Sequence, residues 1–324
     1  EIRQAEVACA AALRSDSRLY MVHSALGALY ANTGRLTDAE QAFRNALDIN
    51  TKDVRAMAGL ADIYRRTQRF SEAEELFITA IDTQPGNWRT VNGYGRFLFT
   101  MGRYHDAAEQ FRLVVSIDPD NATARSNLGS ALMLAAEFEE ARQVLEETVA
   151  REPIAKTYSS LGVILYYLAD FEESVDSHRQ AAELTPSDDV VWLNLADSLH
   201  FAGRTDESTD AYTRAREISA ARLDVDSSDG VAMTTLAWAE HMLGDSEAAL
   251  KLIDKSLQID PEDPYTYYYD ALIRYQTGDS DAALNSLAAA LEKGYPPGLL
   301  VAEPALGEIR ADDRFSAIIV ENIR

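Results

Sequence analysis

The sequence predicts an all-α protein built from tandem pairs of helices, on the strength of three recurring positions. A small residue returns about every 34 positions, and a second small residue follows it after twelve more. A large residue stands four positions after the second small one in most units. The first series is Gly27, Ala61, Gly95, Gly129, Gly162, Ala196, Ala237 and Ala271, and the second is Ala39, Ala73, Ala107, Ala141, Ser174, Ser208, Ala249 and Ala283.

Each unit is predicted to be a helix, a short turn, a second helix and another turn. The large position holds Phe43, Phe77, Phe111, Leu145, His178, Tyr212, Ile253 and Leu287. Large side chains facing small ones at matched heights let two helices pack closely. The turn between the helices holds Gly34, Gln68, Gly102, Ala136, Ala169, Gly203, Gly244 and Gly278, and glycine there ends a helix. Proline, which cannot continue a helix, closes most units.

These units resemble tetratricopeptide repeats. Tyr94-Gly95, Leu128-Gly129 and Leu161-Gly162 match the Leu-Gly step of that family. The resemblance as a whole covers nearly the entire chain. The resemblance is to a bacterial-type array with a terminal capping segment. It implies a right-handed α-α superhelical solenoid of tandem helix-turn-helix repeats, with the first helix of each unit on the inner wall.

Three segments are expected along the chain. Residues 1–19 are predicted to hold the second helix of a truncated leading repeat, because Cys9 precedes Phe43 by the repeat length. Residues 20–294 would hold eight repeats, and residues 295–324 a C-terminal capping segment. Seven additional residues predict a longer second helix near 205–228, either as a plain elongation or as a prong that docks a partner.

The truncated start predicts a chain cut from a longer protein. Targeting signals of that parent would then be missing, so the compartment is open, with the cytoplasm favoured. No stretch approaches the roughly 18 consecutive apolar residues of a membrane helix, so no membrane insertion is expected. The net charge of -23 argues against nucleic acid as a partner, since phosphate binding requires clustered Lys and Arg.

Motifs for chemistry are missing from the sequence. It contains no glycine-rich phosphate loop, no His-Glu-x-x-His and no Gly-x-Ser-x-Gly, and its single cysteine is Cys9. We therefore expect no enzyme, no cofactor and no metal site. His178, alone at a large apolar position, is predicted to be a packed core residue.

The family resemblance places a binding groove on the first helices. Carried over residue by residue, the groove and its flank contain Arg55, Arg65, Arg89, Asn92, Arg96, Asn127, Tyr166, Trp238 and Tyr268. Lys52–Arg103 holds eight basic residues against six acidic ones, within a strongly acidic chain. Arginine suits carboxylates, and asparagine suits the amides of an extended peptide. The alternative is that the arginines pair with neighbouring acids and the aromatic residues pack between units.

Two functions follow from this sequence. The first is a non-catalytic protein-protein interaction scaffold that binds an extended peptide or partner segment in its concave groove. The second is the regulatory or oligomerisation region of a larger signalling enzyme or transcription regulator, whose catalytic or DNA-binding domain lies upstream. In that second case the partner includes another copy of the chain, by self-association.

Overall fold

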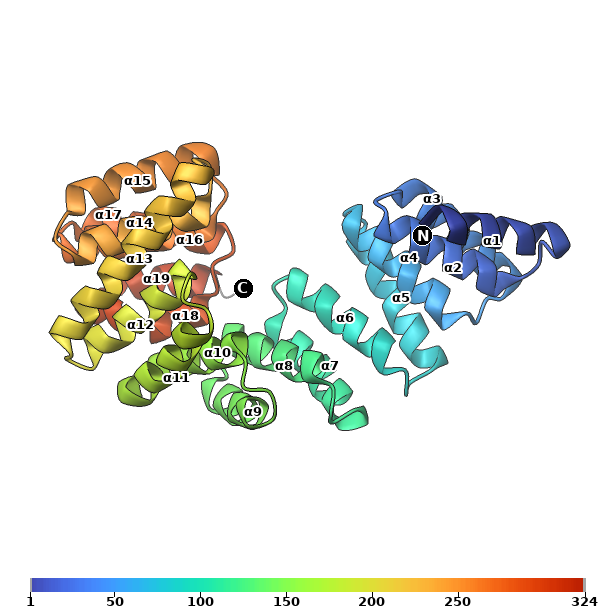
Figure 1. Cartoon of the computed structure of the whole chain (residues 1–324), viewed down its shortest axis with the longest axis horizontal. Coiled ribbons are helices and arrows are strands. Elements are labelled where there is room, and N and C mark those ends of the chain that lie inside the picture. Colours follow the sequence, from blue (N-terminus) through green and yellow to red (C-terminus); the bar gives the residue numbers. More distant parts are fainter. Residues whose placement is uncertain (1, 323–324) are drawn as a thin grey trace. The chain divides into compact units, whose positions relative to one another are not determined.

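The computed structural model describes residues 2–322, which form helices in consecutive pairs and contain no strand (Figure 1). The all-α repeat fold is thus confirmed. Residues 1, 323 and 324, at the outer ends of the predicted segments 1–19 and 295–324, lie outside the described residues. The helices are α1 (Ile2–Ser15), α2 (Tyr20–Asn32), α3 (Leu36–Ile49), α4 (Val54–Arg66), α5 (Phe70–Thr83), α6 (Trp88–Thr100), α7 (Tyr104–Ile117), α8 (Ala122–Leu134), α9 (Phe138–Arg151), α10 (Ala155–Tyr167), α11 (Phe171–Leu184), α12 (Asp189–Phe201), α13 (Thr205–Val225), α14 (Gly230–Met242), α15 (Ser246–Ile259), α16 (Pro264–Gln276), α17 (Ser280–Glu292), α18 (Pro297–Ala302), the 3-10 helix η1 (Pro304–Ala311) and α19 (Asp313–Asn322).

The helices belong to two compact units. Unit 1 ends at Ala131 and unit 2 begins at Leu132, so the boundary falls within α8. Within each unit, the first helix of a pair packs on its own partner and on the first helix of the next pair, as α2 does on α4 and α12 on α14. Second helices pack on their partner and on the following first helix. The first helices therefore lie closer together and line the inner side of each unit.

Backbone conformation explains how each pair turns. All eight predicted turn residues have a positive φ, including the non-glycine residues Gln68, Ala136 and Ala169 at 61°, 59° and 61°. The left-handed residue lets the next backbone N–H groups satisfy the last carbonyls of the helix; Arg35 N, for example, donates to Tyr30 O at 2.9 Å. The predicted turn residues thus mark the same left-handed helix C-terminus in each repeat.

Close helix contact explains the small and large series. A Cβ on Gly27 would lie 2.6 Å from the Phe43 ring, and one on Gly95 would lie 2.8 Å from Phe111. Phe43 and Phe111 are themselves buried. His178, at the equivalent large position, is 1% exposed, as expected of a core residue.

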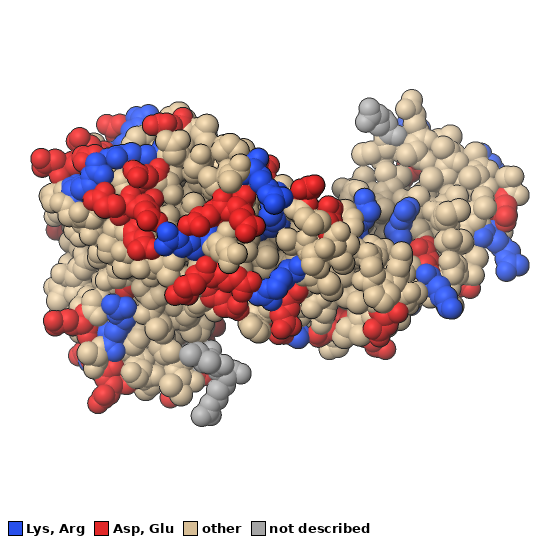
Figure 2. Space-filling view, turned by 90° about the horizontal axis from the view of Figure 1, so that it is seen from below, with Lys and Arg blue, Asp and Glu red and all other residues tan. Residues whose placement is uncertain are grey.

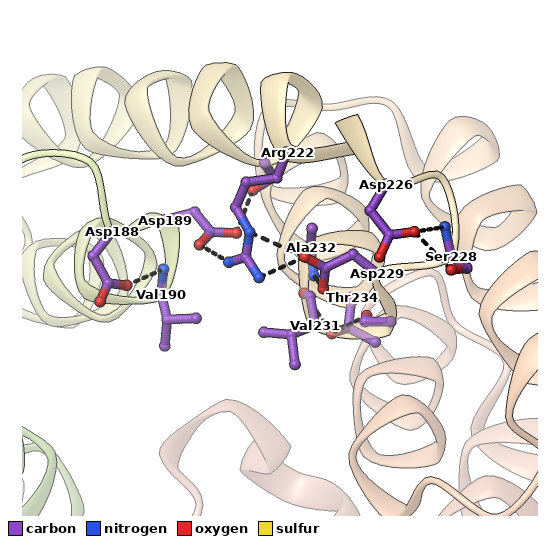
Figure 3. Close-up of polar contacts among 12 residues, drawn as sticks. Asp188, Asp189, Val190, Arg222, Asp226, Ser228, Asp229, Val231, Ala232 and Thr234 are labelled. Carbon is purple, nitrogen blue, oxygen red and sulfur yellow. Dashed lines mark hydrogen bonds and ion pairs between the residues drawn. The ribbon is translucent and has the colours of Figure 1, made fainter. Parts of the chain in front are cut away.

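The seven-residue insertion lies in α13, which has 21 residues where its neighbours have 13 or 14. Side chains of the added turns form hydrogen bonds and ion pairs with α12 and α14. Figure 3 shows the Arg222 guanidinium between the carboxylates of Asp189, at the start of α12, and Asp229, which caps α14. Ser219 Oγ donates to the second oxygen of Asp189 at 3.1 Å. Because the Asp189 side chain is only 1% exposed, the insertion supplies the partners that this buried carboxylate requires.

The C-terminal segment packs on the last repeat and also contacts the turn before α9. Helix α19 packs on α17, and its Phe315 and Ile319 are buried. Residues before α19 turn back into unit 2, where a Cβ on Gly298 would lie 2.5 Å from the Cβ of Ala136 at the turn before α9. This segment therefore contacts both the last repeat and the beginning of unit 2.

Candidate functional site

Arginines on the outer, second-helix side of unit 1 are paired with acids. Each arginine that begins a second helix reaches an acid 29 residues earlier, on the preceding second helix. The pairs are Arg35–Glu6 at 2.5 Å, Arg69–Glu40 at 2.9 Å and Arg103–Glu74 at 2.6 Å. Figure 2 shows acidic and basic side chains intermixed over the face that it presents. These arginines therefore form ion pairs between successive repeats.

The predicted groove arginines differ from those outer ones. Arg55 on α4 and Arg89 and Arg96 on α6 are exposed, and none of the three forms an ion pair within the described part of the chain. The Arg89 guanidinium lies 4.5 Å from the centroid of the adjacent Trp88 ring. Arg65 is the exception, since its Nη2 pairs with Asp62 at 2.8 Å.

Two hollows lie beside these arginines in unit 1. Arg55 lines one of them with Lys52, Ser24 and Asn87. Arg96 lines the other, of about 280 Å³, with Phe99, Thr100, Phe111, Asn127 and Ser130. Asn127, which lines that second hollow, donates from Nδ2 to Oδ1 of the other predicted asparagine, Asn92, over a long 3.4 Å. Unit 1 thus combines unpaired cations, side-chain amides and an aromatic surface on one set of helices.

The three predicted aromatic residues in unit 2 are less exposed than residues on the wall of an open groove would be. Trp238 is 2% exposed and Tyr268 is 9% exposed, while Tyr166 is partly buried. Tyr166 donates to Glu303 Oε1 at 2.7 Å, and Tyr268 donates to Glu303 Oε2 at 2.6 Å. The hydroxyl groups of Tyr166 and Tyr268 are therefore occupied by Glu303 and reach a partner only if this carboxylate leaves its place.

Two acids lie in this region: Glu303 is buried, and Asp197 is partly buried. Asp197 Oδ1 accepts from Tyr212 Oη at 2.6 Å and from Trp238 Nε1 at 2.8 Å. Burial raises the pKa of Asp197 to about 7, although both hydrogen bonds favour the charged form. Burial also raises the pKa of Glu303 above its usual value, against the hydrogen bonds from Tyr268, the Ala305 N–H and Tyr166.

The position of Glu303 was not predicted from the sequence, because the C-terminal segment was expected only at the end of the array. A signal was available in the acid itself. Glu303 follows the apolar residues Leu299 and Leu300 and precedes Pro304, and an acid within an apolar series requires hydrogen-bond donors once buried.

Within residues 2–322, no helix combines the length and apolar character needed to cross a membrane. The same residues contain no group of three or more His, Cys, Asp or Glu side chains arranged to hold a metal ion.

Comparison with known proteins places the repeats in a family. Models of the tetratricopeptide repeat match residues 30–91, 98–160 and 189–262, which together make up more than half of the chain. The chain belongs to the tetratricopeptide repeat family. Proteins with this repeat fold are typically non-catalytic scaffolds for protein interaction.

Curated relatives match this tetratricopeptide repeat protein over short stretches. The peroxisomal targeting signal receptor of Candida albicans is 31% identical over 64 residues, which are 20% of this chain and 11% of that receptor. The receptor of Saccharomyces cerevisiae is 33% identical over 58 residues, 18% of this chain and 10% of the relative. The matches thus span about a tenth of the length of these receptors.

One solved structure resembles the tetratricopeptide array over a larger part. It is the C-terminal part of a tetratricopeptide repeat-containing protein from Cytophaga hutchinsonii, with a TM-score of 0.53 and 17% identity. The alignment covers 75% of this chain and 97% of the other. At this identity the likeness concerns the fold.

Proposed function

We propose that unit 1 binds an extended, acidic segment of a partner protein along its first helices α4, α6 and α8. The observation that carries the proposal is the contrast between two sets of arginines. Arg35, Arg69 and Arg103 are paired with acids on the second helices. Arg55, Arg89 and Arg96 form no ion pair within residues 2–322, although the chain has a net charge of -23.

Their positions suit an extended ligand. Arg55 and Arg89 are 34 residues apart and occupy equivalent places on α4 and α6, while Arg89 and Arg96 lie two turns apart on one face of α6. A guanidinium binds a carboxylate through two parallel hydrogen bonds, so this row favours a ligand with several carboxylates.

Neighbouring groups would fix the ligand backbone and an apolar side chain. The hydrogen bond between Asn127 and Asn92 is long, at 3.4 Å, so both amides are available to peptide N–H and C=O groups. Phe99, partly exposed beside Arg96, provides apolar surface within the same hollow, and the buried Phe111 lies beneath it. The curated relatives are named as receptors of a targeting signal, which agrees with recognition of a short segment.

A peptide library rich in Asp and Glu, screened against the full chain, tests this proposal. We expect peptides from the library to bind the wild-type chain, and Arg89→Glu/Arg96→Glu to weaken that binding by about tenfold or more, because opposite charges become like charges. Added salt should weaken wild-type binding as well.

The matched control is Arg3→Glu/Arg14→Glu. Both residues are exposed on α1, and the double substitution changes the net charge by the same amount. Unchanged affinity in the Arg89/Arg96 variant, or an equal loss in the α1 control, would show that the first helices of unit 1 are not the binding surface.

A further inference from the structure

Unit 2 contains a cavity that the proposed function does not use. Its volume is about 190 Å³, and it lies where the C-terminal segment meets α10, α12 and α16. A water molecule needs roughly 10–15 Å³ by the same measure, so the cavity can take a ligand group of several heavy atoms. All of its lining residues belong to unit 2, so the proposal below does not rest on the peptide site proposed for unit 1.

Tyrosine is the commonest residue in the wall of this cavity. Tyr268 and Tyr295 are stacked with their centroids 4.8 Å apart, and Tyr269 stands edge-on to Tyr268 at 5.1 Å. Tyr265 is 48% exposed, so the cavity communicates with solvent on that side. The tyrosines that line the cavity are Tyr166, Tyr167, Tyr265, Tyr268, Tyr269 and Tyr295.

Asp197 and Glu303 add two carboxylates to this aromatic wall. Both oxygens of Glu303 already accept hydrogen bonds, from Tyr166 and Tyr268. Asp197 is different, because Tyr212 and Trp238 both donate to its Oδ1. Within the described part of the chain, Oδ2 of Asp197 receives no donor, although it is not sealed from the cavity.

No lysine or arginine is among the described residues that line this cavity. His178 also lines it, but burial lowers the pKa of His178 to about 4, so it is neutral at physiological pH. Buried carboxylates are normally paired with a cation. Here the acids share the cavity with aromatic rings, and the faces of such rings also attract cations.

We propose that this cavity binds the cationic head of an amine or guanidine, with Asp197 Oδ2 as the ion partner and the tyrosine faces as the surrounding cage. The head group can belong to a free small molecule or to a Lys or Arg side chain of a partner. Both have the same chemistry at this site, namely a positive charge on a compact group with apolar edges.

Calorimetric titration of the full chain tests the proposal, with tetramethylammonium, n-butylammonium and N-acetyl-lysine amide as separate probes. The indole N–H resonance of Trp238 provides a local reading, because this group donates to Asp197. We expect at least one probe to bind and to shift that resonance. Binding of the simple ammonium ions indicates a free small molecule, whereas binding of the lysine amide alone indicates a partner side chain.

Asp197→Asn is the decisive variant. Asparagine keeps an oxygen that can accept from Tyr212 and Trp238, but it removes the charge, so we expect binding to weaken by about tenfold or more. Asp210→Asn, an exposed acid on α13, is the matched control and should leave binding unchanged. Thermal unfolding of both variants checks that they fold.

Two results would overturn the proposal. One is that no probe binds the wild-type chain at up to about 10 mM, the range of weak ligands. The other is that the probes bind the folded Asp197→Asn variant as tightly as the wild type. If that variant does not fold, Tyr265→Ala at the exposed side serves in its place, and unchanged binding there counts equally against the proposal.

Discussion

Glu303, in the C-terminal segment, accepts a hydrogen bond at 2.7 Å from Tyr166, which lies 137 residues earlier in the chain. Tyr268 donates to the other oxygen of the same carboxylate at 2.6 Å. One acid thus ties a segment that follows the repeats to the first helices of two different repeats.

Removal of this carboxylate should destabilise unit 2. Glu303→Ala leaves two buried tyrosine hydroxyls and the Ala305 N–H without their acceptor, and we expect a loss of about 3 kcal/mol in the free energy of unfolding. Glu303→Gln, which retains an acceptor oxygen, should lose less. Urea unfolding followed by circular dichroism measures both, with the exposed Glu308→Ala as control. Equal stability of Glu303→Ala and the control would contradict the prediction.

His178 should make unit 2 sensitive to acid. Its pKa falls from 6.5 to about 4 in the folded protein because of burial, so the unfolded chain binds this proton first. The contribution to stability is complete above pH 6.5 and is lost as the pH falls towards about 4, by an amount on the order of 3 kcal/mol. His178→Leu, matching Leu145 at the equivalent position, should flatten the unfolding free energy over that window. A variant with the same pH slope as the wild type would show that His178 is not responsible.

Asp197 should act in the opposite direction. Its pKa rises from 3.8 to about 7, so the folded protein holds the proton to higher pH than the unfolded chain does. The unfolding free energy therefore falls as pH rises through that window, and Asp197→Asn should be more stable than the wild type at pH 8 by roughly 2 kcal/mol.

The groups that face Asp197 are Tyr212, Trp238, Tyr166, Tyr269 and Glu303. Glu303 is the other carboxyl group of this set, and burial raises its pKa as well. Stability curves of Asp197→Asn and Asp197→Asn/Glu303→Gln separate the two acids. If the unfolding free energies of the wild type and Asp197→Asn changed in parallel from pH 4 to pH 8, Asp197 would not titrate in the window given by its pKa.

Gln68 is a position where substitution should stabilise unit 1. Its φ is 61°, a conformation that costs a non-glycine residue roughly 1–2 kcal/mol, and its side chain is exposed. After the greater backbone entropy of glycine is subtracted, Gln68→Gly should gain about 0.5–1 kcal/mol in thermal or urea unfolding. The reciprocal Gly34→Ala should lose stability, and a gain there would contradict the explanation.

Arg222 should be more important for stability than its partly exposed position suggests. Arg222→Ala leaves the carboxylate of Asp189, 1% exposed, with Ser219 as its remaining side-chain partner, and we expect a loss of about 3–5 kcal/mol. The double variant Arg222→Ala/Asp189→Asn should recover part of that loss, because no uncompensated charge stays buried. Additive losses in urea unfolding would disprove the coupling between the two residues.

The repeats were predictable from sequence because their determinants are local and recur. Gln68 and Ala136 occupy the turn position without being glycine, yet their place in the series was enough to assign them, and both have a positive φ. The same counting placed Arg89 and Arg96 on a first helix, but it could not show which arginines are paired with acids.

The C-terminal segment was not predictable in the same way. No repeat position governs Glu303, and its place depends on Tyr166 and Tyr268, which the order of residues does not bring together. The periodic pattern located these tyrosines on the inner side of their helices. It could not show that the chain itself covers them.

The approach of Gly298 to Ala136 has a consequence for how unit 2 folds. A simple repeat array has low contact order, so it can nucleate at any pair of helices and fray from either end. A contact between the first and last parts of unit 2 closes a long loop. The chain entropy of that loop is lost before the contact can stabilise the fold. Unit 2 should therefore fold more slowly and more cooperatively than a simple array of equal length, with its last helices protected against fraying.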